Sequence, residues 1–354
     1  MNHIVKLNES DKIVTFGRTV TNEEGTALFW TGSAVDFNIK ASELYMIIEC
    51  GYDGRELMID VILDGERSQK FILQNGTERY TVFRGMNPEK PLKVRIVRDT
   101  QCMPDDGNSF IVIKSLETDG ELTEAAKYDV NLEFVGDSLT SGEGCGLVNR
   151  DEWAPVVFDA IDSYPYKTAK LLNAGYDVLS QSGWGLYASW DADLTHVLPD
   201  YYEQICGITK CEKSIGFGAH DKYDFSRKEM DVVLINLGTN DSGALNTGKF
   251  DRDEFLKAFK KKAIDFLKTI RKNNRACFIV WAYGMLGDDM EPYIKEAIKE
   301  YIKETGDKRA EYLKLPGCTK EDLGARFHPT PAAHSKTAEC IVDFIRSLQV
   351  YMLR

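Results

Sequence analysis

The chain has 354 residues, of which 43% are hydrophobic, and its 56 acidic and 44 basic side chains give a formal charge of −12. This length allows two or three domains with sizeable cores. The acidic balance and the lack of any basic block argue against binding to nucleic acid or to an anionic membrane surface. A neutral polysaccharide or a small neutral ester fits this charge better.

Location and cysteine usage narrow the class of protein further. The first residues, MNHIVKLNESDKIV, lack the basic and apolar regions of a signal peptide. No stretch approaches the ~18 uninterrupted apolar residues of a membrane span. We therefore expect a cytoplasmic protein, or a secreted one if a signal segment has been removed. The eight cysteines are scattered and are expected to be mostly buried free thiols, so no metal site is predicted.

The first 122 residues are expected to form an all-β domain. Short runs with alternating apolar and polar residues recur there, among them ELYMIIEC, LMIDVILDGERSQKFIL and LKVRIVR. Turn signals such as Asp64-Gly65 and Asn75-Gly76 separate these runs. Because a period of two is typical of strands with one buried face, we predict an N-terminal jelly-roll sandwich over residues 1–122.

After the polar segment 117–129, the pattern changes to longer apolar runs that alternate with helical periods. The runs VNLEFVG, YDVLSQSG, DVVLINLG and RACFIVWAYG are typical of strands buried on both faces. Helices are predicted at 164–173, 253–272, 292–303 and 331–348. Residues 128–354 are therefore expected to form a doubly wound parallel α/β/α domain, which binds ligands beyond the carboxyl ends of its strands.

Four short segments that could do chemistry stand at this predicted edge of the sheet. Three follow predicted strands directly, and the fourth precedes the last helix: GDSL at 136–139, SGWG at 182–185, GTND at 238–241 and FHP at 327–329. A serine such as Ser138 is a weak nucleophile and needs a base nearby. Among the five histidines, His328 is the best placed, because Pro329 directs the chain from the edge into a helix.

Attack by a serine on an ester carbonyl creates an oxyanion, which needs donors already aimed at it. The backbone N–H groups of Ser138 and Gly185 could supply two donors, and the side-chain amide of Asn240 a third. Trp184, within the oxyanion segment, and Phe327, beside the base, could crowd an acyl pocket and favour acetyl groups. Both aromatic residues could equally do no more than pack against the sheet.

Each segment alone is a weak signal, but together and in this order they resemble the SGNH hydrolases. The resemblance spans about residues 130–350 and implies that Ser138 is the nucleophile and His328 the base, with Gly185 and Asn240 as oxyanion donors. Gly185 is the better match for the family's glycine than Gly183. The resemblance to the SGNH hydrolases also implies a flavodoxin-like sheet for the second domain.

The first half of the chain resembles a more specific family. The stretch FGRTVTNEEGTALFWTGSAVDFNI is similar to the jelly-roll domain of carbohydrate esterase family two, and DAIDSYPYKTAKLL to the segment after that family's serine. These relatives are two-domain deacetylases of acetylated plant polysaccharides and oligosaccharides, and they work without a cofactor. The resemblance therefore implies an acetylated oligosaccharide or polysaccharide as substrate, with no cofactor and no metal.

One position departs from the superfamily pattern. Many SGNH hydrolases carry an aspartate three residues before the base, where this chain has Ala325. The imidazole still needs an acceptor for its Nδ1–H. We favour a backbone carbonyl, which would give a Ser–His dyad. A carboxylate is the alternative, and Asp322 and Glu321 are the nearest in sequence.

We therefore expect an acetyl esterase that acts on hemicellulose-derived sugars, such as xylan or mannan oligosaccharides. Another SGNH enzyme, such as a lipase, is the near alternative, although no long apolar lid is evident. A non-catalytic carbohydrate-binding protein is the alternative from another class, because jelly rolls are common in lectins. The oligomeric state is left open.

Overall fold

The computed structural model describes residues 2–146 and 151–348, which form two compact units. The first unit runs up to Tyr128 and also includes Glu203–Tyr223. The second unit comprises Asp129–Tyr202 and the chain from Asp224 onward. No motif or change in composition of the sequence indicated that 203–223 belongs to the first unit.

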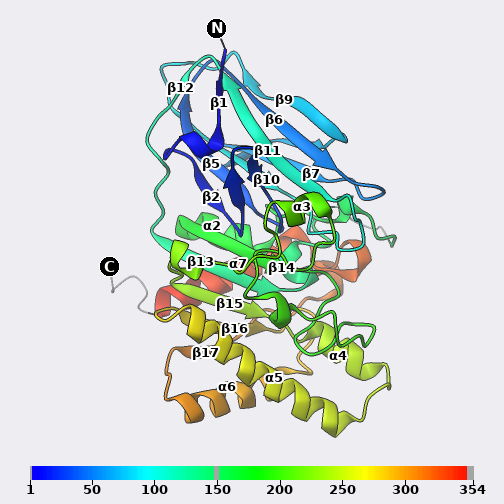
Figure 1. The fold of residues 1–354 in the computed structure, drawn as a ribbon. Helices are drawn as coiled ribbons and strands as arrows, with labels where there is room; N and C mark the ends of the chain where they lie inside the picture. The colour runs from blue at the N-terminus through cyan, green and yellow to red at the C-terminus, as the bar shows by residue number, and fades with distance from the viewer. Residues whose placement is uncertain (1, 147–150, 349–354) are drawn as a thin grey trace. The chain divides into compact units, whose positions relative to one another are not determined.

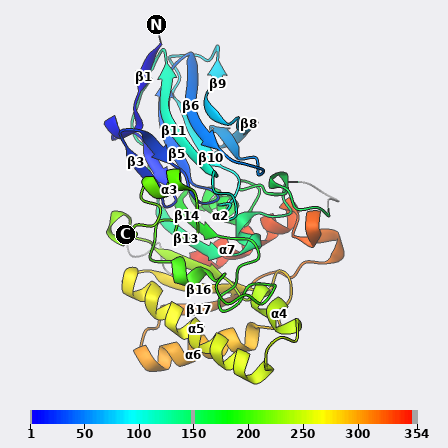
Figure 2. The same cartoon turned by 45° about the vertical axis from the view of Figure 1, so that its right-hand side comes forward.

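The first unit is a sandwich of two antiparallel sheets, as predicted (Figures 1 and 2). One sheet has the order β3 (Val20–Asn22), β4 (Gly25–Ala27), β11 (Phe110–Thr118), β6 (Glu43–Gly51), β9 (Gly76–Arg84), with β1 (His3–Val5) beside β11. The other has the order β12 (Glu121–Leu122), β5 (Ala34–Lys40), β10 (Leu92–Arg98), β7 (Met58–Leu63), β8 (Glu66–Ile72), with β2 (Val14–Phe16) beside β5.

The two turn signals of this unit have different roles. Asp64 and Gly65, with φ of 48° and 87°, form the tight turn of the β7–β8 hairpin. Positive φ at both central positions is what this type of hairpin turn requires. Asn75-Gly76 instead lies where the chain enters β9, with Gly76 as its first residue, and β8 and β9 belong to different sheets. An Asx-Gly pair thus marked a turn in both cases, but a hairpin in only one.

The segment 203–223 is held in the first unit by specific contacts with the sandwich. The Trp30 indole Nε1–H donates to the Ile205 carbonyl at 2.7 Å, and Arg18 Nη1 donates to the Gln204 carbonyl at 2.7 Å. The Sγ atoms of Cys102 and Cys206 lie 3.8 Å apart. The segment contains only a short helix, α3 (Glu212–Gly216), so these long-range contacts decide where it lies.

The second unit has one five-stranded parallel sheet with the order β14-β13-β15-β16-β17. These strands are β14 (Ala174–Ser180), β13 (Val130–Gly136), β15 (Val232–Asn236), β16 (Phe278–Tyr283) and β17 (Ala310–Lys314). Numbered within the unit, this is the 2-1-3-4-5 order of a flavodoxin-like sheet, which confirms the predicted fold. The fifth strand, AEYLK, was not predicted because it is short and more polar than the others.

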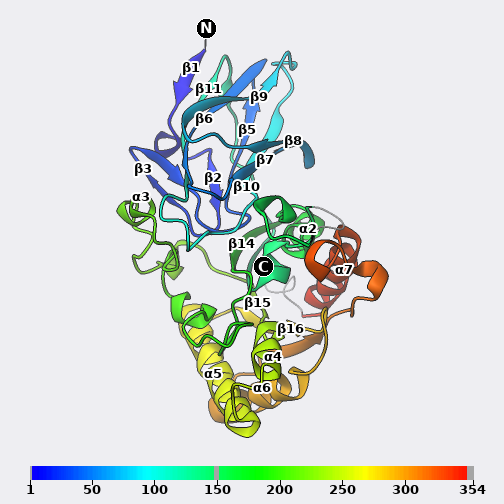
Figure 3. The ribbon, with the colours of Figure 1, turned by 90° about the vertical axis from the view of Figure 1, so that its right-hand side faces the viewer.

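Helices cover both faces of this sheet, as doubly wound folds require. Helices α2 (Tyr164–Leu172) and α7 (Pro331–Ser347) pack together, as do α5 (Arg252–Asn273) and α6 (Glu291–Thr305), and Figure 3 shows these pairs on opposite sides of the strands. Helix α5 begins where the Asp251 carboxylate accepts the Glu254 N–H at 3.0 Å. Its apolar residues recur at helical spacing and are buried, from Phe255 to Ile270.

Two shorter helices begin at the carboxyl edge of the sheet. They are α1 (Ser138–Ser141), after β13, and α4 (Thr239–Asn246), after β15. In β13 and β15, which lead into these helices, every residue except Asn131 is buried, so the edge is the place where polar groups of the sheet become accessible. Within the described residues, no helix is both long enough and apolar enough to span a bilayer.

Candidate active site

Ser138 lies at the point where β13 ends and α1 begins. Asp137 caps this helix, because its Oδ1 accepts the Leu139 N–H at 3.1 Å. Gly142 ends the helix after a single turn, in the left-handed conformation at φ 76°. Ser138 is the first helical residue, so its own N–H has no acceptor within the helix. A buried strand and a one-turn helix thus fix the position of Ser138, and they leave its backbone N–H available to donate a hydrogen bond to a ligand.

His328 lies in the loop between β17 and α7 and contacts the serine directly. Its Nε2 is 2.9 Å from Ser138 Oγ, which is hydrogen-bonding distance for a nucleophile and its base. The close approach depends on Gly144, because a Cβ there would lie 2.6 Å from the Cβ of His328. This explains one of the glycines that follow the serine.

The second ring nitrogen of His328 faces a backbone carbonyl. Nδ1 lies 2.9 Å from the carbonyl oxygen of Arg326, so an Nδ1–H would donate to it and leave Nε2 free to accept the serine proton. The alternative acid, Asp322, lies elsewhere: its Oδ1 accepts from Lys336 at 2.8 Å and its Oδ2 from Thr319. Its hydrogen bond with Lys336 lowers the pKa of Asp322 to about 2. The structure thus has the dyad geometry.

Asn240 comes from the first turn of α4 and is nearly buried beside the nucleophile turn. Its Nδ2 donates to the Trp184 carbonyl at 2.9 Å and to Asp137 Oδ2 at 3.1 Å. Without substrate, both hydrogens of this amide therefore have acceptors within the protein. Burial, together with the charge of the neighbouring Asp241, raises the pKa of Asp137 to about 7. An oxyanion would have to compete with a carboxyl group that is only partly ionised at neutral pH.

The glycine-rich segment after β14 is held by a buried carboxylate. Asp241 accepts the N–H groups of Leu186, Tyr187 and Ala188 at 2.7–3.0 Å. Burial raises the pKa of Asp241 to about 6. The GTND segment thus supplies both Asn240 and the anchor for the loop opposite it, a second role that the sequence did not reveal.

The two glycines of this segment differ in how their amides are used. The Gly185 N–H donates to the His196 carbonyl across a long 3.4 Å bond, and a Cβ at Gly185 would lie 1.9 Å from the Ala188 oxygen. Gly183 has φ +80°, and its N–H has no hydrogen-bond acceptor in the part of the chain described. The predicted oxyanion role of Gly185 therefore has a rival in Gly183.

The aromatic residues near the dyad differ in exposure. Trp184 is 7% exposed and stacks on His196, with ring centroids 4.9 Å apart. This is the packing that the sequence left open as the alternative for Trp184, and its role in an acyl pocket stays a prediction. Phe327, by contrast, is 75% exposed beside the base. Trp190, which sequence reasoning did not select, is 63% exposed and lies against Gly183. An exposed tryptophan leaves no signal in the sequence, because buried and exposed ones look alike.

Glu143 is the other functional candidate that the sequence did not indicate. Its carboxylate is nearly buried and lies 2.6 Å from Arg326 Nε and 3.8 Å from His328 Nε2. The only available signal was its place among the glycines of 142–146. His334, by contrast, is buried behind the site, where its Nδ1 accepts the Tyr164 N–H at 3.1 Å. Burial lowers the pKa of His334 to about 3, so it stays neutral.

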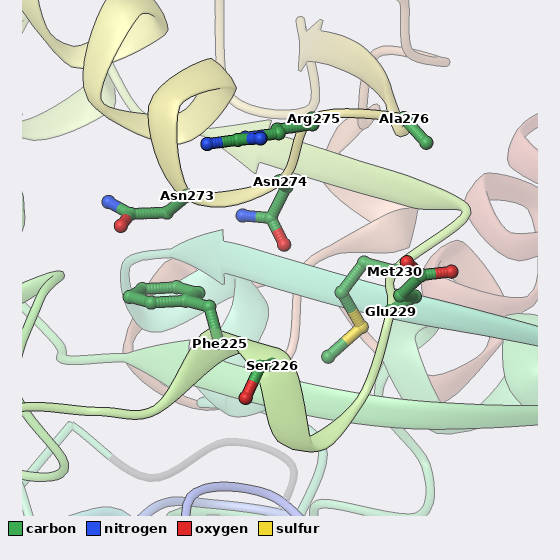
Figure 4. Close-up of a pocket in the computed structure, with 8 residues that line it drawn as sticks. All are labelled: Phe225, Ser226, Glu229, Met230, Asn273, Asn274, Arg275 and Ala276. Atoms are coloured by element: carbon green, nitrogen blue, oxygen red, sulfur yellow. The ribbon is translucent and has the colours of Figure 1, made fainter.

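The second unit also has a pocket whose lining residues, drawn in Figure 4, do not include those of the dyad. It has a volume of about 250 Å³ and is lined by the start of the β15 segment and the end of α5, including Met230 and Asn274. Both of these flank the amino ends of strands, whereas Ser138 and His328 lie at the carboxyl edge. We assign no role in the chemistry to this pocket.

Taken together, the fold and the dyad define a class of protein. A serine hydroxyl bonded to an imidazole, beside a buried asparagine at the carboxyl edge of a 2-1-3-4-5 sheet, is the arrangement of an SGNH-type hydrolase. Comparison with known families agrees. The family described as GDSL-like lipase/acylhydrolase matches residues 132–341, and the carbohydrate esterase 2 N-terminal domain matches residues 15–121. The chain belongs to the GDSL/SGNH hydrolases and, within them, to carbohydrate esterase family two.

Individual relatives agree with this placement. The structure superposes on an acetyl xylan esterase from the rumen bacterium Butyrivibrio proteoclasticus with a TM-score of 0.94 and 34% identity, covering 99% of each chain. The acetylxylan esterase/glucomannan deacetylase of Cellvibrio japonicus is 24% identical over 95% of this chain and 88% of its own length. The cellulase/esterase CelE of Acetivibrio thermocellus is 25% identical over 92% of this chain, which spans only 38% of CelE.

Proposed function

We propose that this protein is a carbohydrate O-acetyl esterase that removes acetyl groups from hemicellulose-derived sugars, such as xylan or mannan oligosaccharides. The observation that carries the proposal is the 2.9 Å contact between Ser138 Oγ and His328 Nε2, with Nδ1 turned to the Arg326 carbonyl. Membership of carbohydrate esterase family two supports the substrate class, since relatives in that family are named for acetylated xylan and glucomannan.

The first half of the reaction acylates the serine. Ser138 Oγ attacks the acetyl carbonyl carbon while its proton passes to His328 Nε2, giving a tetrahedral intermediate and an imidazolium. The intermediate collapses by breaking the bond to the sugar oxygen. His328 gives the same proton to that oxygen, so the sugar leaves as an alcohol and the acetyl group stays on the serine.

The second half regenerates the enzyme. His328 Nε2 takes a proton from water as the water oxygen attacks the acetyl-serine carbonyl. The second tetrahedral intermediate expels Ser138 Oγ, which recovers the proton from the imidazolium. The product is acetic acid, which gives up its remaining proton to solvent and leaves as acetate. The Nδ1–H contact with the Arg326 carbonyl holds the neutral ring in one tautomer and keeps the ring in place while it is protonated.

Both intermediates carry an oxyanion, for which three donors are proposed. The Ser138 N–H, at the first position of α1, and the Asn240 amide are two of them. Gly185 was the predicted third, and the Gly183 N–H is the better candidate because it has no acceptor in the described chain. Removing one such donor commonly costs 10²–10³ in kcat, or roughly 3–4 kcal/mol.

The exposed aromatic residues are proposed to contact the sugar. Trp190 lies against Gly183, and Phe327 precedes His328 in the chain. Both are exposed, and exposed aromatic faces suit the apolar faces of sugar rings. If they stack on an oligosaccharide, Trp190→Ala should raise KM for acetylated xylo-oligosaccharides several-fold and leave kcat/KM for a small aryl acetate unchanged. Equal losses on both substrates would contradict this assignment.

The decisive experiment measures acetate release from acetylated xylo- and manno-oligosaccharides. Purified protein should release acetate from at least one of the two, and Ser138→Ala should release none while keeping its circular dichroism spectrum. A protein that binds these sugars without releasing acetate would instead be a lectin. A protein that prefers butyryl or longer aryl esters over acetyl by more than about tenfold in kcat/KM would be another SGNH esterase or lipase.

A further inference from the structure

The carbonyl that orients His328 belongs to a stretch of strained backbone. Arg326 and Phe327 have φ of 56° and 58°, the left-handed region that only glycine enters without cost. Each such residue costs roughly 1–2 kcal/mol, so the conformation persists only where other contacts hold it. Without a restraint, relaxation at Arg326 would rotate its carbonyl away from Nδ1 of the base.

The restraint is the side chain of Arg326 itself. Its Nε donates to Glu143 Oε1 at 2.6 Å, and its Nη1 donates to the Asp151 carbonyl at 3.2 Å. The Arg326 side chain is 33% exposed, whereas that of Glu143 is only 3% exposed. A charge-assisted bond to a nearly buried, fixed carboxylate is much stronger than an exposed surface ion pair.

Glu143 is in turn fixed to the segment that carries the nucleophile. Its backbone N–H donates to the Ser138 carbonyl at 3.0 Å, and its backbone pairs with Phe158 in an isolated bridge. The carboxylate therefore connects the serine turn with the histidine loop, which are 190 residues apart in sequence. Its other oxygen, Oε2, lies 3.8 Å from His328 Nε2, where positive charge develops when the base takes the serine proton.

We propose that Glu143 is a positioning residue for acyl transfer at Ser138. Through the Glu143–Arg326 ion pair, it holds the carbonyl that fixes the tautomer and direction of His328. The chain thereby replaces the triad carboxylate that Ala325 cannot supply, with a carboxylate that acts on the base through a second residue and the backbone. This inference rests on the proposed esterase function.

The test removes the charge of Glu143 and leaves its shape. Glu143→Gln should lower kcat on an aryl acetate by roughly ten- to hundredfold, the usual cost of misplacing a catalytic group by up to ~1 Å, and change KM less than about twofold. Arg326→Gln should have a similar effect and, because the residue is partly exposed, should fold. The double variant should be no worse than the more impaired single variant, because both break the same contact.

A matched control separates positioning from general loss of an ion pair. Asp307 pairs with Arg271 Nε at 2.7 Å in the same unit, and both side chains are mostly buried. Asp307→Asn should lower the melting temperature and leave kcat within about twofold. A spectroscopic readout adds a second check: the downfield proton signal of His328 Nδ1–H should broaden or shift in Glu143→Gln and stay unchanged in Asp307→Asn.

The outcomes distinguish this inference from the proposed function. If Glu143→Gln keeps kcat within twofold and an unchanged Nδ1–H signal, or if the two single losses multiply in the double variant, the positioning role is wrong. If the wild type hydrolyses no acetyl ester, the esterase proposal fails instead. The positioning role is then measured by the rate at which a fluorophosphonate modifies Ser138, which needs the serine and base but no acetyl ester.

Discussion

The turn that carries Ser138 and the loop that carries His328 meet at the hydrogen bond between these two residues. The contacts that hold the turn and the loop in place are nevertheless different. The serine turn follows β13, which pairs with strands on both sides, and its capping residue Asp137 is fully buried. The histidine loop follows the edge strand β17 and has left-handed residues. Two ion pairs hold it: Lys336–Asp322, whose lysine is well exposed, and Arg326–Glu143, whose carboxylate is nearly buried.

This difference shows which residues determine the position of each member of the dyad. A serine at the end of a buried strand is positioned by its immediate neighbours in sequence. A histidine on an irregular loop is positioned by side chains from distant segments. We therefore expect changes in the serine turn to act on chemistry and on buried electrostatics, and changes in the histidine loop to act only where they reach the Arg326 carbonyl.

The largest effect should come from the two atoms where the segments meet. Ser138→Ala and His328→Ala should each lower kcat on acetyl esters by at least ~10⁴-fold, because nucleophile and base act as a unit. The double variant should be hardly worse than either single one. Initial rates of acetate release, with circular dichroism as the fold control, measure this. Near wild-type activity in Ser138→Ala would refute the mechanism.

The next largest effect is expected at Asn240, the buried amide beside the serine turn. Asn240→Ala should lower kcat by roughly 10²–10³-fold with little change in KM, because the amide is proposed to stabilise an oxyanion that exists only in the transition state. Steady-state kinetics on an aryl acetate measures the two constants. A loss of less than about threefold in kcat would show that Asn240 serves only Asp137 and the Trp184 carbonyl.

The serine turn should also make stability depend on pH. Burial raises the pKa of Asp137 to about 7 in the folded protein, well above its ordinary value of 3.8. Between these values the folded state holds a proton that the unfolded state has lost, so stability falls as pH rises, by up to ~1.4 kcal/mol per pH unit. Urea unfolding at pH 4–8 measures this fall.

The matching variant isolates the contribution of that carboxyl group. As pH rises from about 4 to 7, the free energy of unfolding of Asp137→Asn should fall less than that of the wild type. The fall caused by Asp241, whose pKa is raised to about 6, should remain in both proteins. Parallel curves for the two proteins would mean that Asp137 does not hold the proton in the folded state.

The smallest effect is expected in the histidine loop, away from the Arg326 carbonyl. Asp322→Asn and Glu321→Gln should each lower kcat by less than tenfold, or ~1.4 kcal/mol, because the Asp322 carboxylate bonds Lys336 and Thr319 and not the imidazole. A true triad acid would cost about 10⁴. A thousandfold loss of kcat in either variant, with the fold intact, would show that the carboxylate of that residue orients His328.

Much of the fold could be predicted from sequence because its signals are local. Alternating runs indicated the sandwich, and uninterrupted apolar runs such as VNLEFVG indicated β13 to the residue. Two features escaped this reasoning. Strand β17 is an edge strand with exposed positions, so its composition is not that of a buried strand. The segment 203–223 has little regular structure, and its position depends on partners such as Trp30, far away in sequence.

By itself, the sequence determined the two folds and indicated the serine, the histidine and the buried amide that are proposed to do the chemistry, because each of these depends on residues adjacent along the chain. Tertiary structure alone decided what orients the base, which glycine amide is unoccupied, and that Trp184 is buried while Trp190 is exposed. The reason is physical. Hydrogen bonds and exposure at the edge of the sheet depend on how irregular loops fold and on partners such as Glu143 and Arg326, which are 183 residues apart. No local pattern records which groups meet there.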